Sequence, residues 1–168
     1  MTEKENSNQN VAVVLPDRET IGIKRMPVKV KKLVPEAVIP KYSKPGDAGA
    51  DITAVAYEYD YLNDVHVYHT GLAFEVPEGY VMLAFPRSSN MKTNVYLPNS
   101  VGVIDSGYRG EVQFRFKNRD RKLNYKPYEI GDRVGQVIII PYPIIDYIES
   151  DELSTTERGE GGFGHTGK

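Results

Sequence analysis

The sequence predicts an all-β domain: a sandwich, jelly roll or barrel built from short strands. Several segments alternate apolar and polar residues, and one longer segment is continuously apolar. The 11 prolines and 15 glycines of the chain separate these segments as turns would. No long stretch has the 3.6-residue period of an amphipathic helix. At 168 residues the chain has the length of one domain with a substantial core.

The first expected elements are short strands with one side toward the core. Residues 27–33 (PVKVKKL) place Val28 and Val30 on one side and lysines on the other, which predicts a strand. The tyrosines of residues 57–62 (YEYDYL) are typical of half-buried strand faces. Residues 89–97 (SNMKTNVYL) hold at most a short helix.

Two later segments predict strands with stronger burial. In residues 110–118 (GEVQFRFKN) the apolar side chains alternate with polar ones, so one set should face the core. That set is Val112, Phe114 and Phe116. Residues 134–142 (VGQVIIIPY) are almost continuously apolar, which predicts a strand buried on both faces.

Composition excludes several classes of function. The formal net charge of −2 gives no basic field that would attract nucleic acid or an anionic membrane. The chain has no cysteine, which removes disulfides, thiolate nucleophiles and sulfur-ligated zinc. No apolar run approaches the roughly 18 residues of a membrane span, and the first ten residues do not resemble a signal peptide. We therefore expect a cytoplasmic protein with neither nucleic acid nor membrane as a partner.

The chain divides into three parts. Residues 1–25 are an N-terminal extension, expected to be partly disordered because residues 1–10 are polar and poor in apolar side chains. Residues 26–150 form the β domain. Residues 151–168 are a flexible C-terminal arm, in which five of the last eleven residues are glycine.

The polar loop at residues 102–112 (GVIDSGYRGEV) has two interpretations. One is a β-hairpin whose aspartate and glycines serve the turn. The other is functional: Asp105 lies at the end of a rigid strand and could activate a water. The ring of Tyr108 could then pack against a sugar or a base.

Two further loops offer groups for a phosphate and for a divalent cation. Residues 86–90 (PRSSN) are typical either of a turn capped by one of its serines or of a phosphate site. In the second case the Arg87 guanidinium and the hydroxyl groups would donate to the anion. In residues 44–52 (KPGDAGADI), Asp51 precedes a strand and could reach Mg²⁺ through water.

The remaining polar residues are individually weak indicators of function. In residues 131–139 (GDRVGQVII), Arg133 is interpreted as a buried ion-pair partner and Gln136 as a polar group of a strand. His66 and His69 stand three apart in an expected strand and so face opposite sides. They are interpreted as surface or cross-strand residues rather than ligands.

Five segments, taken in order, closely resemble the five ordered motifs of the trimeric dUTPase family (deoxyuridine triphosphate nucleotidohydrolases). The resemblance extends from about Met26 to Lys168. The segments are AGADI (48–52), PRSSN (86–90), NSVGVIDSGYRGE (99–111), GDRVGQVII (131–139) and RGEGGFGHTGK (158–168).

The resemblance implies a distorted jelly roll that assembles as a homotrimer with active sites between the copies. It implies hydrolysis of dUTP to dUMP and pyrophosphate, which limits uracil in DNA and supplies dUMP for dTMP synthesis. Asp105 would be the general base that activates the water attacking the α-phosphorus. Tyr108 would lie against the deoxyribose and exclude a 2′-hydroxyl. Asn99 and the backbone around Val103 would contact uracil, and Asp51 would hold Mg²⁺ through water.

The resemblance also assigns phosphate and lid residues. The C-terminal arm would close over the bound nucleotide, with Arg158 at the γ-phosphate and Phe163 stacked on uracil. The other positions that match phosphate-binding residues of the family are Arg87, Ser88, Ser89, Gln136, Gly164, His165 and Thr166.

Three departures from the family pattern stand out. His165 occupies a position that is usually serine, Gly135 replaces a common alanine, and residues 117–130 form a charged segment that resembles a lengthened loop. Two alternatives to dUTP hydrolysis stay open. A dCTP deaminase, alone or bifunctional, would use a glutamate near the third motif, where Glu111 is the neighbouring carboxylate. A regulatory binding protein of the same fold would act through residues 1–25 and 117–130.

Overall fold

The computed structural model describes residues 25–120 and 126–162. In these ranges the regular structure consists of strands and one short 3₁₀ helix, which confirms the all-β prediction. The elements are β1 (Lys29–Lys32), β2 (Ala50–Thr53), β3 (Ala56–Asp60), β4 (Val65–His69), β5 (Leu72–Glu75), β6 (Tyr80–Phe85), η1 (Ser88–Lys92), β7 (Val95–Tyr96), β8 (Gly102–Ile104), β9 (Gln113–Asn118) and β10 (Arg133–Pro141).

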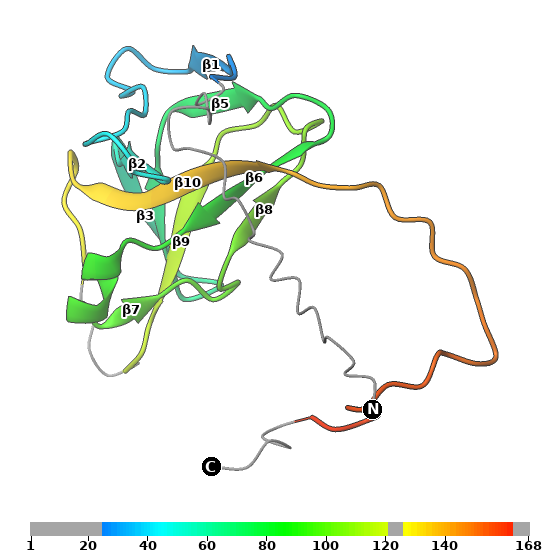
Figure 1. Cartoon of the computed structure of the whole chain (residues 1–168). Coiled ribbons are helices and arrows are strands. Elements are labelled where there is room, and N and C mark those ends of the chain that lie inside the picture. The colour runs from blue at the N-terminus through cyan, green and yellow to red at the C-terminus, as the bar shows by residue number, and fades with distance from the viewer. Residues whose placement is uncertain (1–24, 121–125, 163–168) are drawn as a thin grey trace, which may run out of the picture.

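Two four-stranded sheets form the body of the molecule (Figure 1). One has the strand order β2-β10-β6-β8 and the other β3-β4-β9-β7, and all neighbouring strands are antiparallel. β1 pairs with β5 beside them. The non-sequential strand order is that of a jelly-roll-like fold, as the sequence predicts.

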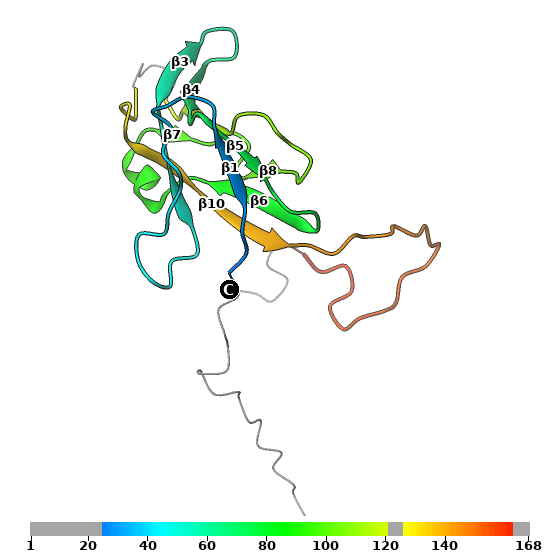
Figure 2. The ribbon, with the colours of Figure 1, turned by 90° about the horizontal axis from the view of Figure 1, so that it is seen from above.

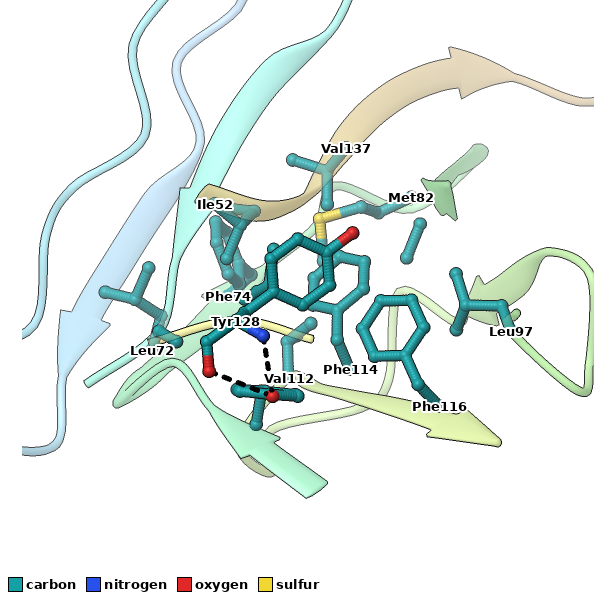
Figure 3. Packing of buried hydrophobic residues seen from close by; sticks show 14 of the residues in the cluster. Ile52, Leu72, Phe74, Met82, Leu97, Val112, Phe114, Phe116, Tyr128 and Val137 are labelled. Atoms are coloured by element: carbon teal, nitrogen blue, oxygen red, sulfur yellow. Dashed lines mark hydrogen bonds between the residues drawn. The ribbon is translucent and has the colours of Figure 1, made fainter. Parts of the chain in front are cut away.

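The core lies between the two sheets and is centred on aromatic rings (Figure 3). Phe114 and Phe116 of β9 are fully buried, which confirms the alternation predicted for residues 110–118. Tyr128 packs against Phe116 with ring centroids 5.5 Å apart. The Tyr68 hydroxyl donates to the Tyr128 carbonyl oxygen and accepts from its N–H, both at 3.1 Å. The charged segment 117–130 therefore contains a core tyrosine near its C-terminal end.

Two sequence predictions about strands are corrected by the pairing. β8 pairs with β6, whereas β9 pairs with β4 and β7, so residues 102–112 are not a hairpin. They cross from one sheet to the other. β10 is buried on both faces only in its first half, because Ile140 near its end is 40% exposed in the single chain. Periodicity within one strand cannot show where a neighbouring sheet stops covering it.

The histidines of β4 differ from each other. His66 is 1% exposed, so its interpretation as a surface residue is wrong, but it does bridge strands. The Tyr57 hydroxyl lies 3.0 Å from its Nδ1, and the amide of Asn118 lies 3.0 Å from its Nε2. Burial lowers the pKa of His66, a shift that its contacts with Asn118 and Asp64 only partly offset.

After β10 the chain leaves the body. Residues 142–162 form neither helix nor strand, and Figures 1 and 2 show them running out beside the sheets. Every residue from 142 to 160 is exposed. The large apolar side chains among them are Tyr142, Ile144, Ile145, Tyr147, Ile148 and Leu153.

Candidate active site

Three of the polar motifs meet where β2, β10 and β6 lie side by side. Gln136 of β10 is the cross-strand partner of Asp51 in β2 and of Phe85 in β6. Arg87 follows Phe85 by two residues, so it emerges at the same edge. The antiparallel pairing thus brings together three segments that are far apart in the sequence.

The carboxylate of Asp51 is shared between two guanidinium groups. Arg87 donates from Nε to Oδ1 at 2.8 Å, and Arg133 donates from Nη1 to Oδ2 at 2.9 Å. The side chain of Asp51 is 20% exposed and that of Arg133 is 52% exposed. Two positive charges against one negative charge leave this cluster with a net positive charge at the surface, which suits an anion.

The neighbouring polar groups are held in place by local contacts. Arg87 Nη1 donates to Ser89 Oγ at 3.3 Å, and Gln136 Nε2 donates to the carbonyl oxygen of Pro86 at 3.1 Å. A Cβ on Gly49 would lie 2.4 Å from Gln136 Oε1, so a larger residue there would require the amide to move from this position. We call the group of Asp51, Arg87, Arg133 and Gln136 the arginine end of the sheet.

The capped-turn interpretation of residues 86–90 is wrong. η1 begins at Ser88, and its N-cap residue is Arg87, in extended conformation and without a side-chain capping bond. Ser88 is exposed at the start of this helix and Ser89 is half-buried. The serines are therefore beside the arginine end without serving as the cap.

Asp105 and Tyr108 lie in a different place, directly after β8. Asp105 is exposed, and its carbonyl oxygen accepts from the Tyr108 N–H at 3.1 Å. The Tyr108 hydroxyl donates to the Glu111 carbonyl oxygen at 3.0 Å, while the residue stays 47% exposed. A Cβ on Gly110 would lie 2.4 Å from the Tyr108 hydroxyl oxygen, so the ring can fold back only over glycine.

The two residues expected to contact a base are Asn99, in the turn before β8, and Val103, in β8 itself. Asn99 is exposed, and its carbonyl oxygen accepts from the Val101 N–H at 2.6 Å. Ser100 between them has φ 59°, in the left-handed region that non-glycine residues seldom adopt. Val103 in β8 is 65% exposed. Backbone and side-chain groups of this turn are thus open to a ligand. We call residues 99–108 the β8 end.

Strand register separates these two groups in a single chain. β8 runs antiparallel to β6 with Gly102 opposite Ala84 and Ile104 opposite Met82. Asp105 therefore continues toward the start of β6, whereas Arg87 follows its end. The offset from Met82 to Arg87 alone corresponds to about 17 Å at ~3.4 Å per residue. One chain does not bring Asp105 to the arginine end.

The C-terminal motif is described only at its beginning. Arg158 is exposed, and its Nε donates to the carbonyl oxygen of Gly161 at 2.9 Å. The other expected arm residues, Phe163, Gly164, His165 and Thr166, lie outside the described residues. Among the predicted site residues, the single chain therefore groups Asp51, Arg87, Ser89 and Gln136, but not Asp105, Tyr108 or Arg158.

Arg133 is the member of the cluster that sequence reasoning undervalued. It is an ion-pair partner, as interpreted, but it is half-exposed and shares its carboxylate with Arg87. The register between β10 and β2 shifts between Arg133 and Gly135. A regular alternation gives no sign of such a bulge, so the direction of the Arg133 side chain could not be anticipated.

No group of three or more acidic, histidine or cysteine side chains in residues 25–120 and 126–162 is arranged to bind a metal ion by itself. Asp51 fits a water-mediated contact, because each carboxylate oxygen accepts one arginine bond and keeps a second lone pair. Within the same ranges, no helix is long and apolar enough to cross a membrane.

The fold and this cluster define an all-β protein with a positively charged cluster at one sheet edge, and comparison with known proteins is specific. The dUTPase family model matches residues 35–167. A deoxyuridine 5′-triphosphate nucleotidohydrolase from Leifsonia xyli is 38% identical over 132 residues, covering 77% of this chain and 85% of that protein. One from Fusobacterium nucleatum is 39% identical over 147 residues, covering 84% and 98%. The chain belongs to the dUTPase family.

Solved structures agree with this assignment. The dUTPase of Staphylococcus bacteriophage 80alpha, solved with dUPNHPP, superposes with a TM-score of 0.69 at 30% identity, covering 84% of this chain and 99% of that one. A dUTPase from phage phi11 of S. aureus, solved with a structural Mg(II) ion, has the same fold, with a TM-score of 0.60 at 24% identity. That pair covers 76% of this chain and 98% of the phage protein.

Proposed function

We propose that this protein hydrolyses dUTP to dUMP and pyrophosphate, and so limits uracil in DNA and supplies dUMP for dTMP synthesis. The observation that carries the proposal is the arginine end, where Arg87 and Gln136 meet at one sheet edge in a chain of the dUTPase family. A triphosphate needs such charge neutralisation, because positioning and electrostatics supply most of the catalysis in phosphoryl transfer.

The complete site lies between copies of the chain in a homotrimer. The separation of Asp105 from Arg87 along β6 supports this, because hydrolysis needs both groups at one nucleotide. The exposed apolar side chains of residues 142–153 support it as well, since exposed apolar side chains gathered in one segment are typical of a protein–protein contact. A neighbouring copy would cover it.

In the assembled site Asp105 is the general base. It is exposed and follows a strand, so it can accept a proton from the water that attacks the α-phosphorus. Asn99 and the backbone at Val103 contact uracil, and Tyr108 packs against the deoxyribose. The phosphates are bound by Arg87, Ser88, Ser89 and Gln136, joined by the arm residues Arg158, Gly164, His165 and Thr166, while Phe163 stacks on the base.

Asp51 is the residue that would hold Mg²⁺, through water molecules rather than directly. When bound, the ion supplies charge neutralisation along the triphosphate. Both carboxylate oxygens of Asp51 accept from arginines, so an ion held through water there would lie close to the groups proposed to bind phosphate. Mg²⁺ commonly keeps several waters, so a single second-sphere carboxylate is chemically reasonable.

The chain is organised to supply its arm to another copy. The β domain comprises residues 26–150, preceded by the extension at residues 1–25, and residues 151–168 act as the lid. The described part of this arm is exposed and lies away from the sheets (Figure 1). A lid of this kind excludes water from the reacting phosphate and opens for product release.

The deaminase alternative is disfavoured by the bonds of Glu111. Its Oε1 accepts from the Gly71 N–H at 2.7 Å, and its Oε2 accepts from His69 at 2.8 Å. Burial opposes ionisation of Glu111, but the hydrogen bonds from His69, Gly71 and Gln113 outweigh it and lower its pKa. Because both of its oxygens already accept hydrogen bonds and its pKa is lowered, this carboxylate is a weak base for the proton transfers of deamination.

A nucleotide panel tests the proposal. The chain is incubated with Mg²⁺ and each of dUTP, dCTP, dTTP and UTP, and pyrophosphate and ammonia are measured separately. We expect pyrophosphate from dUTP at a rate well above that from the other three, and no ammonia. Ammonia release from dCTP would favour the deaminase instead, and turnover of UTP equal to that of dUTP would remove the role of Tyr108.

A further inference from the structure

His69 lies outside the proposed active site, yet it is bonded to the segment that carries Tyr108. It is the last residue of β4, and its side chain lies between two carboxylates. Nδ1 is 2.8 Å from Glu111 Oε2, and Nε2 is 3.6 Å from Glu58 Oε1. Gln113 Nε2 also donates to Glu111 Oε2, at 3.1 Å. The same carboxylate oxygen therefore contacts one side chain from β4, His69, and one from β9, Gln113.

The bonds to Glu111 fix one end of the crossing between the sheets. Its Oε1 accepts from Gly71 N–H at 2.7 Å. The next residue, Val112, donates from its N–H to the Leu72 carbonyl oxygen at 2.9 Å. The Val112 carbonyl oxygen accepts from the Thr70 hydroxyl at 2.6 Å. The end of the crossing is thus fastened to residues 69–72, while Asp105 at its start is exposed.

The same fastening determines where Tyr108 lies. The Tyr108 hydroxyl donates to the carbonyl oxygen of Glu111, and its ring folds over Gly110. A shift of the Glu111 backbone would therefore shift the phenol. The contact path runs from His69 to the Glu111 carboxylate, through the Glu111 backbone, and then to the Tyr108 hydroxyl.

We propose that His69 is a positioning residue for sugar discrimination: by donating from Nδ1 to Glu111 it fixes the Tyr108 ring against the deoxyribose. The inference rests on the proposed function, in which Tyr108 excludes the 2′-hydroxyl of UTP. It adds a residue that touches no substrate and acts through one hydrogen bond. Exclusion of a single hydroxyl depends on the ring position to a fraction of an ångström, so a loosened anchor should lower selectivity before it lowers binding.

Two amide substitutions form a matched pair. In His69→Asn the amide nitrogen stands as many bonds from Cβ as Nδ1 does, so the donor to Glu111 is kept. In His69→Gln the donor moves to the place of Nε2, next to Glu58. Both variants are uncharged and polar, so they differ mainly in which carboxylate they can reach. Glu58→Gln is the control for the other side of the ring.

The measurement is the ratio of kcat/KM for dUTP to kcat/KM for UTP. We expect His69→Gln to lose roughly tenfold in this ratio, mostly through faster UTP turnover, with the KM for dUTP little changed. His69→Asn and Glu58→Gln should keep the wild-type ratio. Thermal melts of all three variants establish that they are folded, and native mass spectrometry establishes that they assemble as wild type does.

A double-mutant cycle tests the path. Tyr108→Phe removes the hydroxyl that bonds the Glu111 carbonyl oxygen. If His69 acts through that bond, the losses in selectivity from His69→Gln and Tyr108→Phe should not add. Additive losses, equal losses in the Asn and Gln variants, or a wild-type ratio in His69→Gln would each overturn the inference.

The results that would contradict the proposed function differ from those that would contradict only the role of His69. If the wild-type chain does not hydrolyse dUTP, or if Tyr108→Ala leaves the ratio unchanged, the role of Tyr108 is wrong and the inference falls with it. If wild type prefers dUTP and Tyr108→Ala loses that preference while His69→Gln keeps it, only the role of His69 is wrong.

Discussion

The two ends of the β2-β10-β6-β8 sheet are built in different ways. At the arginine end, Asp51, Arg87 and Arg133 are bonded to one another in the single chain. At the β8 end, Asp105, Val103 and Tyr108 are exposed. The side chains of the first end are held together by ion pairs within the chain, whereas Asp105, Val103 and Tyr108 at the second are exposed to solvent.

This difference bears on the proposed division between binding and chemistry. If the arginine end binds the phosphates, as proposed, its preformed ion pairs hold Arg87 and Arg133 in fixed positions, so little reorganisation is needed on binding. Asp105 is exposed, and within the described ranges no ion pair includes it, so a water molecule can reach its carboxylate. Mutations at the two ends should therefore separate catalysis from stability and affinity.

The largest effect is expected from Asp105→Asn. The amide keeps the shape of the side chain but cannot take the proton of the attacking water, so kcat should fall by roughly 10²–10⁴-fold. Melting temperature and affinity for a non-hydrolysable dUTP analogue should not change, because Asp105 is exposed. Calorimetric binding beside single-turnover kinetics checks this, and an unchanged kcat would remove Asp105 from the mechanism.

Removal of the arm should be the next largest effect. A chain that ends at Ser154 keeps every strand in the described part of the chain, since β10 ends at Pro141, so it should fold and assemble. It should nevertheless hydrolyse dUTP poorly, because the lid is lost. The spacer of residues 149–157 reaches about 30 Å at ~3.3–3.6 Å per extended residue, which is enough to cross to a neighbouring copy.

A mixing experiment decides whether the arm works on another copy. The truncated chain is refolded together with full-length Asp105→Asn, and mixed trimers are identified by native mass spectrometry. Such a trimer can place an intact arm over an intact Asp105 of another chain, so activity should return above that of either parent. Mixed trimers as inactive as both parents would show that each arm serves its own chain.

Asp51→Asn should affect stability and affinity together. The change leaves Arg87 and Arg133 without their shared carboxylate. The free energy of unfolding should fall by about 1 kcal/mol, a small value for charged partners, because these side chains are partly exposed. Affinity for the triphosphate with Mg²⁺ should also fall. Chemical denaturation and titration with the analogue measure the two quantities, and Asp105→Asn is the matched carboxylate control.

Much of this architecture could be predicted from sequence. Alternation located Phe114 and Phe116 in the core because burial of one strand face imposes a period of two. The motif order identified the segments that carry Asp51, Arg87 and Gln136, which the sheet then brings to one edge. Sequence spacing could not show which of these segments would share an edge, because that depends on strand order.

Other features depend on tertiary contacts that no local pattern encodes. The crossing at residues 102–112 looked like a hairpin because Asp and Gly favour turns in either setting. Burial of His66 follows from Tyr57 and Asn118 on neighbouring strands. The replacement of a common alanine by Gly135 looked minor until the ring of Phe114 was placed against it.

Gly135→Ala should lower the free energy of unfolding of the whole domain, with no specific effect on the arginine end or the β8 end. A Cβ at this position would lie 2.0 Å from the Phe114 ring, and overpacking of this kind costs about 1–3 kcal/mol. Adding Phe114→Leu removes the ring, so the double variant should be less destabilised than the sum of the two single changes. Urea denaturation of the four proteins checks the coupling, and simple additivity would mean that the strand moves aside instead.

The smallest effect on stability should come from lowering the pH, through protonation of His66. This residue lies in β4 of the other four-stranded sheet, so the change should act on both ends alike. Burial keeps the pKa of His66 below 6.5 in the folded chain, so the neutral form is favoured on folding. Above pH 6.5 His66 is neutral in both the folded and the unfolded chain, so its contribution to stability is fully present. As the pH falls from 6.5 toward the folded pKa, the unfolded chain takes up a proton that the folded chain does not, and this contribution is lost. The free energy of unfolding should thus decline below pH 6.5, and His66→Gln should flatten the part of the curve due to this residue. Parallel curves for wild type and His66→Gln between pH 7 and 5 would show that other groups govern the acid response.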